Sequence, residues 1–118
     1  MNDHLRRGII FFNEGQYFNA HESWEDLWRE SEGDSRTYFQ GLVQVAVGLH
    51  HLKSGNLRGG NRVLIRGLSK LEIRPDQCHG IENAALVAEL QKVVGSPDSP
   101  LSPIRIVVTV TGPAGERA

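Results

Sequence analysis

Apolar residues recur at helical spacing along most of the first 95 positions of the chain. Leu5, Ile9 and Phe12 mark one face of a first predicted helix, residues 3–12, with Asp3 as its expected N-cap. The same spacing returns in segment after segment, with glycine or proline between the segments. The pattern therefore predicts a helical protein.

The predicted helix over residues 36–53 differs from the others because apolar side chains point nearly all the way round it. That pattern is typical of a buried central helix. Its valines would also suit a strand, but its length and its lack of strict alternation favour a helix. Gly41 and Gly48 share one face, and each costs up to about 1 kcal/mol against alanine. We therefore expect another helix to approach closely there.

Three further helices are predicted over residues 16–29, 57–73 and 81–94. Gly59 and Gly60, in the first turn of the helix over residues 57–73, again suggest close packing. The predicted fold class is all-α: one domain of about five helices around a buried central helix, with an extended C-terminal tail.

The chain changes character after residue 95. Residues 96–103 hold three prolines and three serines, which is linker composition. Residues 104–111 alternate well enough for a strand, which could lie over the helices, pair with another copy or fray. We thus expect a helical domain over residues 1–95 and a linker with an extended or disordered tail over residues 96–118.

Composition places few demands on partners. The chain of 118 residues has 13 basic and 14 acidic side chains, a net charge of -1, which implies no nucleic-acid, membrane or acidic-substrate partner. Its one cysteine, Cys78, excludes an intrachain disulfide and a cysteine-based zinc site. No apolar run is long enough for a signal peptide or a membrane span, so we expect a cytoplasmic protein.

The densest candidate chemistry lies in the second predicted helix. His21 and Glu25 are one turn apart and could both point at one ion. Glu22 lies about a quarter turn from that face and could act as a base or simply face water. A catalytic zinc usually takes three protein ligands, so a third ligand must come from another helix.

The central helix offers polar groups for such a site. Gln40, Gln44 and His51 form a stripe on it, and buried glutamines need hydrogen-bond partners. If the second and third helices pack antiparallel, this stripe can join His21 and Glu25 in one cluster. Three interpretations stay open: a structural polar network, a metal or small-ligand site, and metal-free acid–base catalysis. No nucleophile motif, phosphate loop or dinucleotide turn is present.

A basic stripe on the fourth predicted helix has two interpretations. Its members recur every fourth residue: Arg58, Arg62, Arg66, Lys70 and Arg74. It could be a solvated face, or it could bind phosphates or an acidic partner. The near-neutral net charge argues against nucleic acid as a partner.

Three segments, in order and at matching separations, resemble the signatures of the DUF309 family of small helical proteins: residues 13–28, 39–60 and 66–71. The resemblance implies an all-helical fold and the description "predicted metal-dependent hydrolase". Carried onto this chain, the polar signature falls on His21, Glu22, Glu25, Gln40, Gln44 and His51.

The leading hypothesis is a hydrolase with its site between the second and third helices. In it a divalent metal, zinc or manganese, binds His21, Glu25 and His51, and Glu22 is the general base that activates a water molecule. Gln40 and Gln44 orient a small-molecule substrate. The rival hypothesis is a non-catalytic helical interaction module whose polar cluster only fixes the packing. A homodimer is compatible with either hypothesis.

Overall fold

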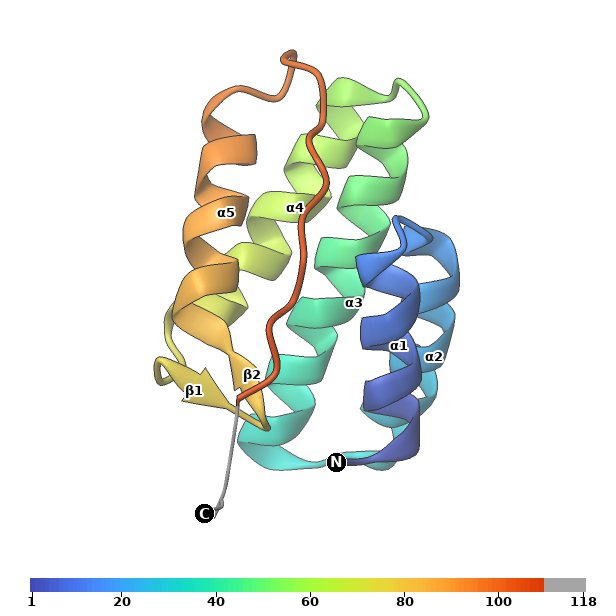
Figure 1. Cartoon of the computed structure of the whole chain (residues 1–118), viewed down its shortest axis with the longest axis vertical. Coiled ribbons are helices and arrows are strands. Elements are labelled where there is room, and N and C mark those ends of the chain that lie inside the picture. Colours follow the sequence, from blue (N-terminus) through green and yellow to red (C-terminus); the bar gives the residue numbers. More distant parts are fainter. Residues whose placement is uncertain (110–118) are drawn as a thin grey trace.

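The computed structural model describes residues 1–109, which form five helices and a small hairpin (Figure 1). The elements in chain order are α1 (Asp3–Asn13), α2 (Tyr17–Glu30), α3 (Gly33–Lys53), α4 (Leu57–Glu72), β1 (Gln77–Cys78), β2 (Ile81–Glu82) and α5 (Asn83–Gly95). The predicted all-α domain of about five helices is confirmed. None of the helices in residues 1–109 has the length and apolar character needed to cross a membrane.

Helix α3 lies between α2 and α4 and supplies the largest share of the core (Figure 1). Tyr38, Leu42, Val45 and Leu49 have no exposed surface. These four share one face of the helix, and Phe39 and Val43, about 100° or more further round it, are also buried. Burial on several sides confirms that α3 is central. Burial of this kind stabilises the fold by about 25 cal/mol for each Å² of apolar surface removed from water.

Helices α3 and α4 approach each other through paired glycines. A Cβ atom added to Gly48 would lie 2.9 Å from the carbonyl oxygen of Gly60. A Cβ atom added to Gly41 would lie 3.1 Å from the carbonyl oxygen of Gly67. Ordinary carbon contacts need more room than this, so the close approach expected at Gly41, Gly48 and Gly60 is confirmed. Gly59 differs, because a Cβ atom there would meet the side chain of Asn56 rather than another helix.

Helices α1 and α2 pack around a buried indole. Trp24 has no exposed surface, and its ring lies against Gly8, where any side chain would overlap it. The indole Nε1–H donates to the carbonyl oxygen of Leu5 at 3.2 Å. A buried indole needs such a partner, so this bond and the missing side chain at Gly8 fix the two helices together.

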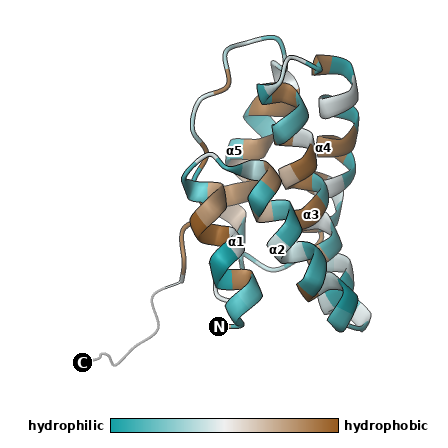
Figure 2. Cartoon of the chain, turned by 90° about the vertical axis from the view of Figure 1, so that its right-hand side faces the viewer, coloured by the Kyte–Doolittle hydropathy of each residue, from teal (hydrophilic) through white to brown (hydrophobic). Residues whose placement is uncertain are grey.

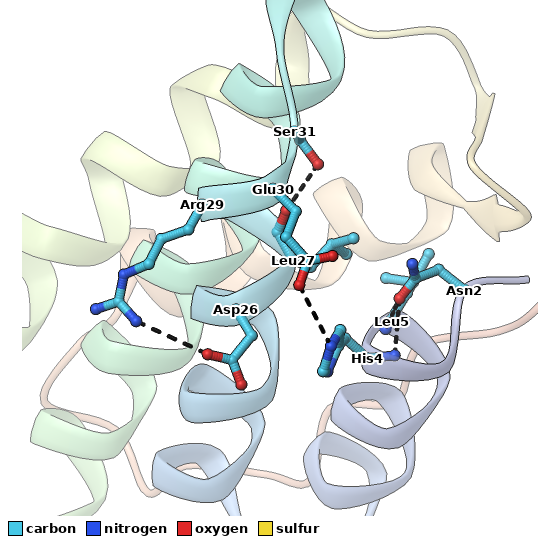
Figure 3. A network of polar contacts seen from close by, with 8 residues as sticks. All are labelled: Asn2, His4, Leu5, Asp26, Leu27, Arg29, Glu30 and Ser31. Carbon is cyan, nitrogen blue, oxygen red and sulfur yellow. Dashed lines mark hydrogen bonds and ion pairs between the residues drawn. The ribbon is translucent and has the colours of Figure 1, made fainter.

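The start of α1 corrects the expected cap. Asn2, not Asp3, is the N-cap: its Oδ1 accepts from the backbone N–H groups of His4 at 2.7 Å and Leu5 at 3.3 Å (Figure 3). Asp3 cannot cap because it is already the first helical residue, whereas a cap needs non-helical backbone. His4 Nε2 also lies 3.7 Å from Glu30 Oε2, which links this end of α1 to the end of α2 (Figure 3).

The β1–β2 hairpin was not expected from the sequence. Residues 81–82, predicted as the start of the fifth helix, form β2 instead, and α5 begins at Asn83. The two residues between the strands, His79 and Gly80, both have positive φ, 52° and 82°. Positive φ at both central residues is the two-residue turn that joins twisted antiparallel strands. This turn reverses the chain before α5 and so delays the helix.

The described part of the C-terminal segment, residues 96–109, runs back across the helices (Figure 1). Ile104 and Ile106 are each 3% exposed and belong to the core. The Asn13 side chain pairs with the backbone of Ile106: its Nδ2 donates to the carbonyl oxygen at 3.0 Å, and its Oδ1 accepts from the N–H at 2.6 Å. The segment is thereby attached to the end of α1.

Beyond Ile106 the segment meets the hairpin. Val108 forms an isolated antiparallel bridge with Ile81. Of the three alternatives for residues 104–111, the structure shows residues 104–109 extended over the helices. The disorder expected for residues 112–118 lies outside the described residues.

Candidate functional site

The candidate residues lie on one three-helix face, which we call the α2–α3–α4 face. Helices α2 and α4 flank α3, while α1 and the described C-terminal segment lie on the other side of the molecule (Figures 1 and 2). The face comprises Phe18, His21, Glu22 and Glu25 of α2, Gln40, Gln44 and His51 of α3, and Val63, Arg66 and Lys70 of α4. Phe18, Glu22 and Arg66 are exposed, and the others are half-buried.

His21 contacts its own helix and, through an aromatic ring, α3. Its Nδ1 lies 2.7 Å from the carbonyl oxygen of Phe18. The Phe18 ring lies 4.9 Å from the His21 ring and 5.3 Å from the His50 ring, between centroids. Phe18 and His50 are thus part of this surface, although sequence reasoning assigned neither of them to the site. The helical spacing of Phe18 and His21, three residues apart, was the signal available for Phe18.

Glu25 has a basic neighbour on the same helix. Its Oε1 lies 3.5 Å from one terminal nitrogen of the Arg29 guanidinium, and the other terminal nitrogen lies 3.7 Å from Asp26 Oδ1. One turn beyond Glu25, the half-buried Trp28 ring carries the guanidinium of Arg36, at 4.9 Å from the ring centroid. Such stacking is a favourable cation–π contact, and it joins the end of α2 to the start of α3.

The polar stripe of α3 turns towards α4. Gln44 Oε1 accepts a hydrogen bond from Lys70 Nζ at 2.8 Å. Within residues 1–109, no hydrogen bond or ion pair connects His21 or Glu25 of α2 to the stripe residues Gln40, Gln44 and His51. The structure therefore brings these residues to one face, in contact with neighbours from three helices, rather than into one closed cluster.

The side chains of the face that could bind a metal come from two helices. The described residues hold no group of three or more His, Cys, Asp or Glu side chains arranged around one ion position. His21 and Glu25 are two donors on one helix, and His51 lies on another helix with the His50 ring as its aromatic neighbour, 5.7 Å away. In the structure these three side chains are not gathered around one point.

A second polar centre lies between α3, α4 and α5. The Tyr38 hydroxyl donates to Asn83 Oδ1 at 3.1 Å, and Asn83 Nδ2 donates to the carbonyl oxygens of Leu71 at 2.9 Å and Pro75 at 3.2 Å. Asn83 is 1% exposed. Burial raises the pKa of Tyr38 well above its usual range. Since every polar atom here has a partner, this centre fixes the packing.

Next to this centre, the turn residue His79 packs on Tyr38 and Phe39, with ring centroids 5.5 Å and 4.7 Å away. Burial, and secondarily the positive charge of Arg74, lower the pKa of His79. Arg74 itself lies 3.5 Å from Asp34. The last member of the basic stripe thus has a partner at the start of α3 and is not free on the surface of α4.

These observations define a small all-α domain of antiparallel helices with a polar strip across three of them. The chain belongs to the DUF309 family, described as "Domain of unknown function (DUF309)", whose family model matches residues 5–63. The match covers α1 to α3 and the first part of α4.

Two similar proteins are themselves uncharacterised. An "Uncharacterized protein" of Aquifex aeolicus (strain VF5) is 30% identical over 93 residues, which cover 78% of this chain and 28% of that protein. "Uncharacterized protein YpuF" of Bacillus subtilis (strain 168) is 31% identical over 88 residues, covering 72% of this chain and 51% of that protein. The chain thus spans about half, or less, of the length of these relatives.

Proposed function

We propose that this protein is a non-catalytic helical interaction module whose binding surface is the α2–α3–α4 face. The length of the polar stripe on α3 carries the proposal. From Gln40 to His51 the helix rises by about 16 Å, at 1.5 Å per residue. Metal ligands must instead gather within about 2.0–2.3 Å of one ion. A stripe of this length suits a macromolecular surface better than a point site.

The composition of the face supports the same proposal. Phe18 is 50% exposed and adds an aromatic ring to the face, and aromatic residues are enriched in the cores of protein interfaces. Trp28 and Arg36 stack beside the stripe, and tryptophan and arginine are the residue types that contribute most to protein interfaces. The glycine contacts between α3 and α4 hold the backbone beneath the face in a fixed position.

Photocrosslinking in cells tests the proposal. Gln40, at one end of the polar stripe, is replaced by the photoreactive residue benzoylphenylalanine, and Ala88, exposed on α5, is replaced in the matched control. We expect a discrete crosslinked product from position 40 and none from position 88. Equal labelling from both positions would refute a binding role for the face.

A metal-dependent hydrolase is the second candidate, and one observation favours it. In the tautomer whose Nδ1–H donates a hydrogen bond to the Phe18 carbonyl oxygen, at 2.7 Å, the Nε2 atom of His21 is available as a metal ligand. Glu25 and His51 would complete the ligand set, Glu22 would be the base, and Gln40 and Gln44 would orient a small-molecule substrate.

Metal content of the tag-free protein decides this candidate, with zinc and manganese titration of the wild type and a His21→Ala variant. The hydrolase candidate predicts near-stoichiometric metal that is lost in the variant. Absence of uptake by both proteins would refute it.

A further inference from the structure

We propose that the occupant of the α2–α3–α4 face is a second copy of this chain, related by a two-fold axis parallel to the helices. The inference rests on the proposed binding role of the face. It starts from a separation of charge that the net value of -1 conceals. Helix α2 carries four carboxylates and one arginine, a net charge of -3. Helix α4 carries four cations and one glutamate, a net charge of +3.

The two charged helices do not neutralise each other within one chain. They lie on opposite sides of α3. Three of the four carboxylates of α2 pair within α2 or with α1: Glu25 and Asp26 with Arg29, and Glu30 with His4. In the part of the chain that the structure describes, no carboxylate lies within ion-pair distance of four cations of α4: Arg58, Arg62, Arg66 and Lys70.

Symmetry decides how a second copy can meet this face. Two flat faces that pack against each other can be related by a two-fold axis parallel to α3 or by one that crosses α3 at a right angle. The parallel axis places α2 of each copy opposite α4 of the other. The crossing axis places α2 on α2 and α4 on α4. Juxtaposed like charges oppose association, so the charge pattern selects the parallel axis and a self-complementary interface.

Contacts with α3 show how far along the helix axis the charged residues of α2 and α4 lie. Phe18 of α2 contacts His50, and Gly60 of α4 contacts Gly48 at nearly the same level of α3. Because α2 and α4 both run antiparallel to α3, the turn of α2 after Phe18 is level with the turn of α4 after Gly60.

A two-fold axis parallel to the helices leaves these positions along the helix axis unchanged in the second copy. Glu22 lies in the turn after Phe18, level with the stretch of α4 between Arg62 and Arg66. All three side chains are exposed. In the proposed dimer, Glu22 of each copy therefore faces Arg62 and Arg66 of the other, and the pairing occurs twice.

The face is large enough for a stable dimer. Helices α2, α3 and α4 have 14, 21 and 16 residues and span about 21, 31 and 24 Å. At a packing distance of 8–10 Å each helix contributes a strip about 9 Å wide, so the three strips cover roughly 700 Å². That area approaches the ~800 Å² that each partner buries in a standard interface. Phe18 adds an exposed apolar anchor at one end.

Sedimentation equilibrium of the full chain, at about 50 mM and about 500 mM salt, tests the proposal. We expect a dimer that weakens with salt, since exposed charges are screened. Glu22→Arg and Arg66→Glu should each raise the dissociation constant at least about tenfold, or about 1.4 kcal/mol. The double variant Glu22→Arg/Arg66→Glu should return towards the wild-type value. Glu89→Arg, an exposed reversal on α5, is the control and should change nothing.

Two sedimentation results would overturn the proposal: a monomer at every concentration, or a single reversal that tightens association, as the crossing axis requires. The crosslink from position 40 separates this failure from that of the binding face itself. A product of twice the chain mass supports the second copy. A product with another polypeptide keeps the binding face and overturns the second copy, and absence of any product overturns both.

Discussion

Replacing Gly48 with alanine is the most direct perturbation of the contact between α3 and α4. The added Cβ would lie 2.7 Å from the backbone nitrogen of Leu64 and 2.9 Å from the carbonyl oxygen of Gly60. Both atoms belong to the backbone of α4, so no side chain can rotate to make room. The two helices must move apart by several tenths of an ångström.

Two effects of opposite sign determine the magnitude. Alanine favours helix over glycine by about 1 kcal/mol. Overpacking a well-packed contact costs about 1–3 kcal/mol, and the backbone position of the clash places Gly48→Ala towards the upper end. Leu64, which has no exposed surface, also loses contacts when the helices separate. We therefore expect the free energy of unfolding to fall by about 1–2 kcal/mol.

Urea unfolding, monitored by circular dichroism, measures this change in the free energy of unfolding. With a slope of about 2 kcal/mol per molar urea, the midpoint should fall by about 0.5–1 M. Gly95→Ala is the matched control, because a Cβ at the end of α5 meets nothing within 4 Å. It should keep or raise the midpoint. A Gly48→Ala protein as stable as the Gly95→Ala protein would refute the close-contact reasoning.

Three further predictions concern other parts of the fold. Asn83→Ala should lower the free energy of unfolding by about 3 kcal/mol, because it removes the partner of the buried Tyr38 hydroxyl and of the Pro75 carbonyl, together with one bond to the Leu71 carbonyl. Tyr38→Phe should cost about 1 kcal/mol in the same urea experiment, and the reverse order would contradict the network. Asn13→Ala removes both bonds to Ile106 and should speed amide hydrogen exchange in the C-terminal segment, while unchanged exchange there would show that burial alone holds it. The pKa of His79 is lowered in the fold from 6.5. The unfolded state therefore binds the proton more readily, and stability falls as pH drops below about 6.5. The urea midpoint of His79→Asn should fall less than that of the wild type between about pH 7.5 and 5, and identical pH profiles would contradict this.

The helices could be predicted because their signals are local. Helical spacing of apolar residues and the breaks between segments need no knowledge of distant contacts. The glycines of α3 were informative because glycine lowers the stability of a helix relative to alanine. The close contact with α4 offsets that loss. The hairpin was missed because asparagine or aspartate normally precedes glycine in such a turn, and here His79 takes that position. The course of the C-terminal segment depends on Asn13, far away in sequence.

For the candidate site, sequence predicted which residues share a face but not which neighbours they contact. Helical spacing places Gln40, Gln44 and His51 on one stripe. It cannot tell that Gln44 turns to Lys70 of α4, nor that Phe18 lies between two histidine rings. Those contacts depend on side-chain rotamers and on the helix beside each residue, which only tertiary packing determines.

Combining two perturbations separates the stability of the fold from association through the face. A two-fold axis midway between α2 and α4 exchanges the two helices whatever their spacing, so a small shift of α4 leaves acidic and basic helices opposite each other. Gly48→Ala should therefore lower stability and, under conditions where the protein is folded, keep the dimer dissociation constant within about threefold. Glu22→Arg should do the reverse, because an exposed side chain changes stability little but meets the partner's cations. Sedimentation equilibrium and urea unfolding of both variants test these opposite effects on dimerisation and stability. If Gly48→Ala weakens the dimer as much as Glu22→Arg does, the helix contact and the binding face act as one unit.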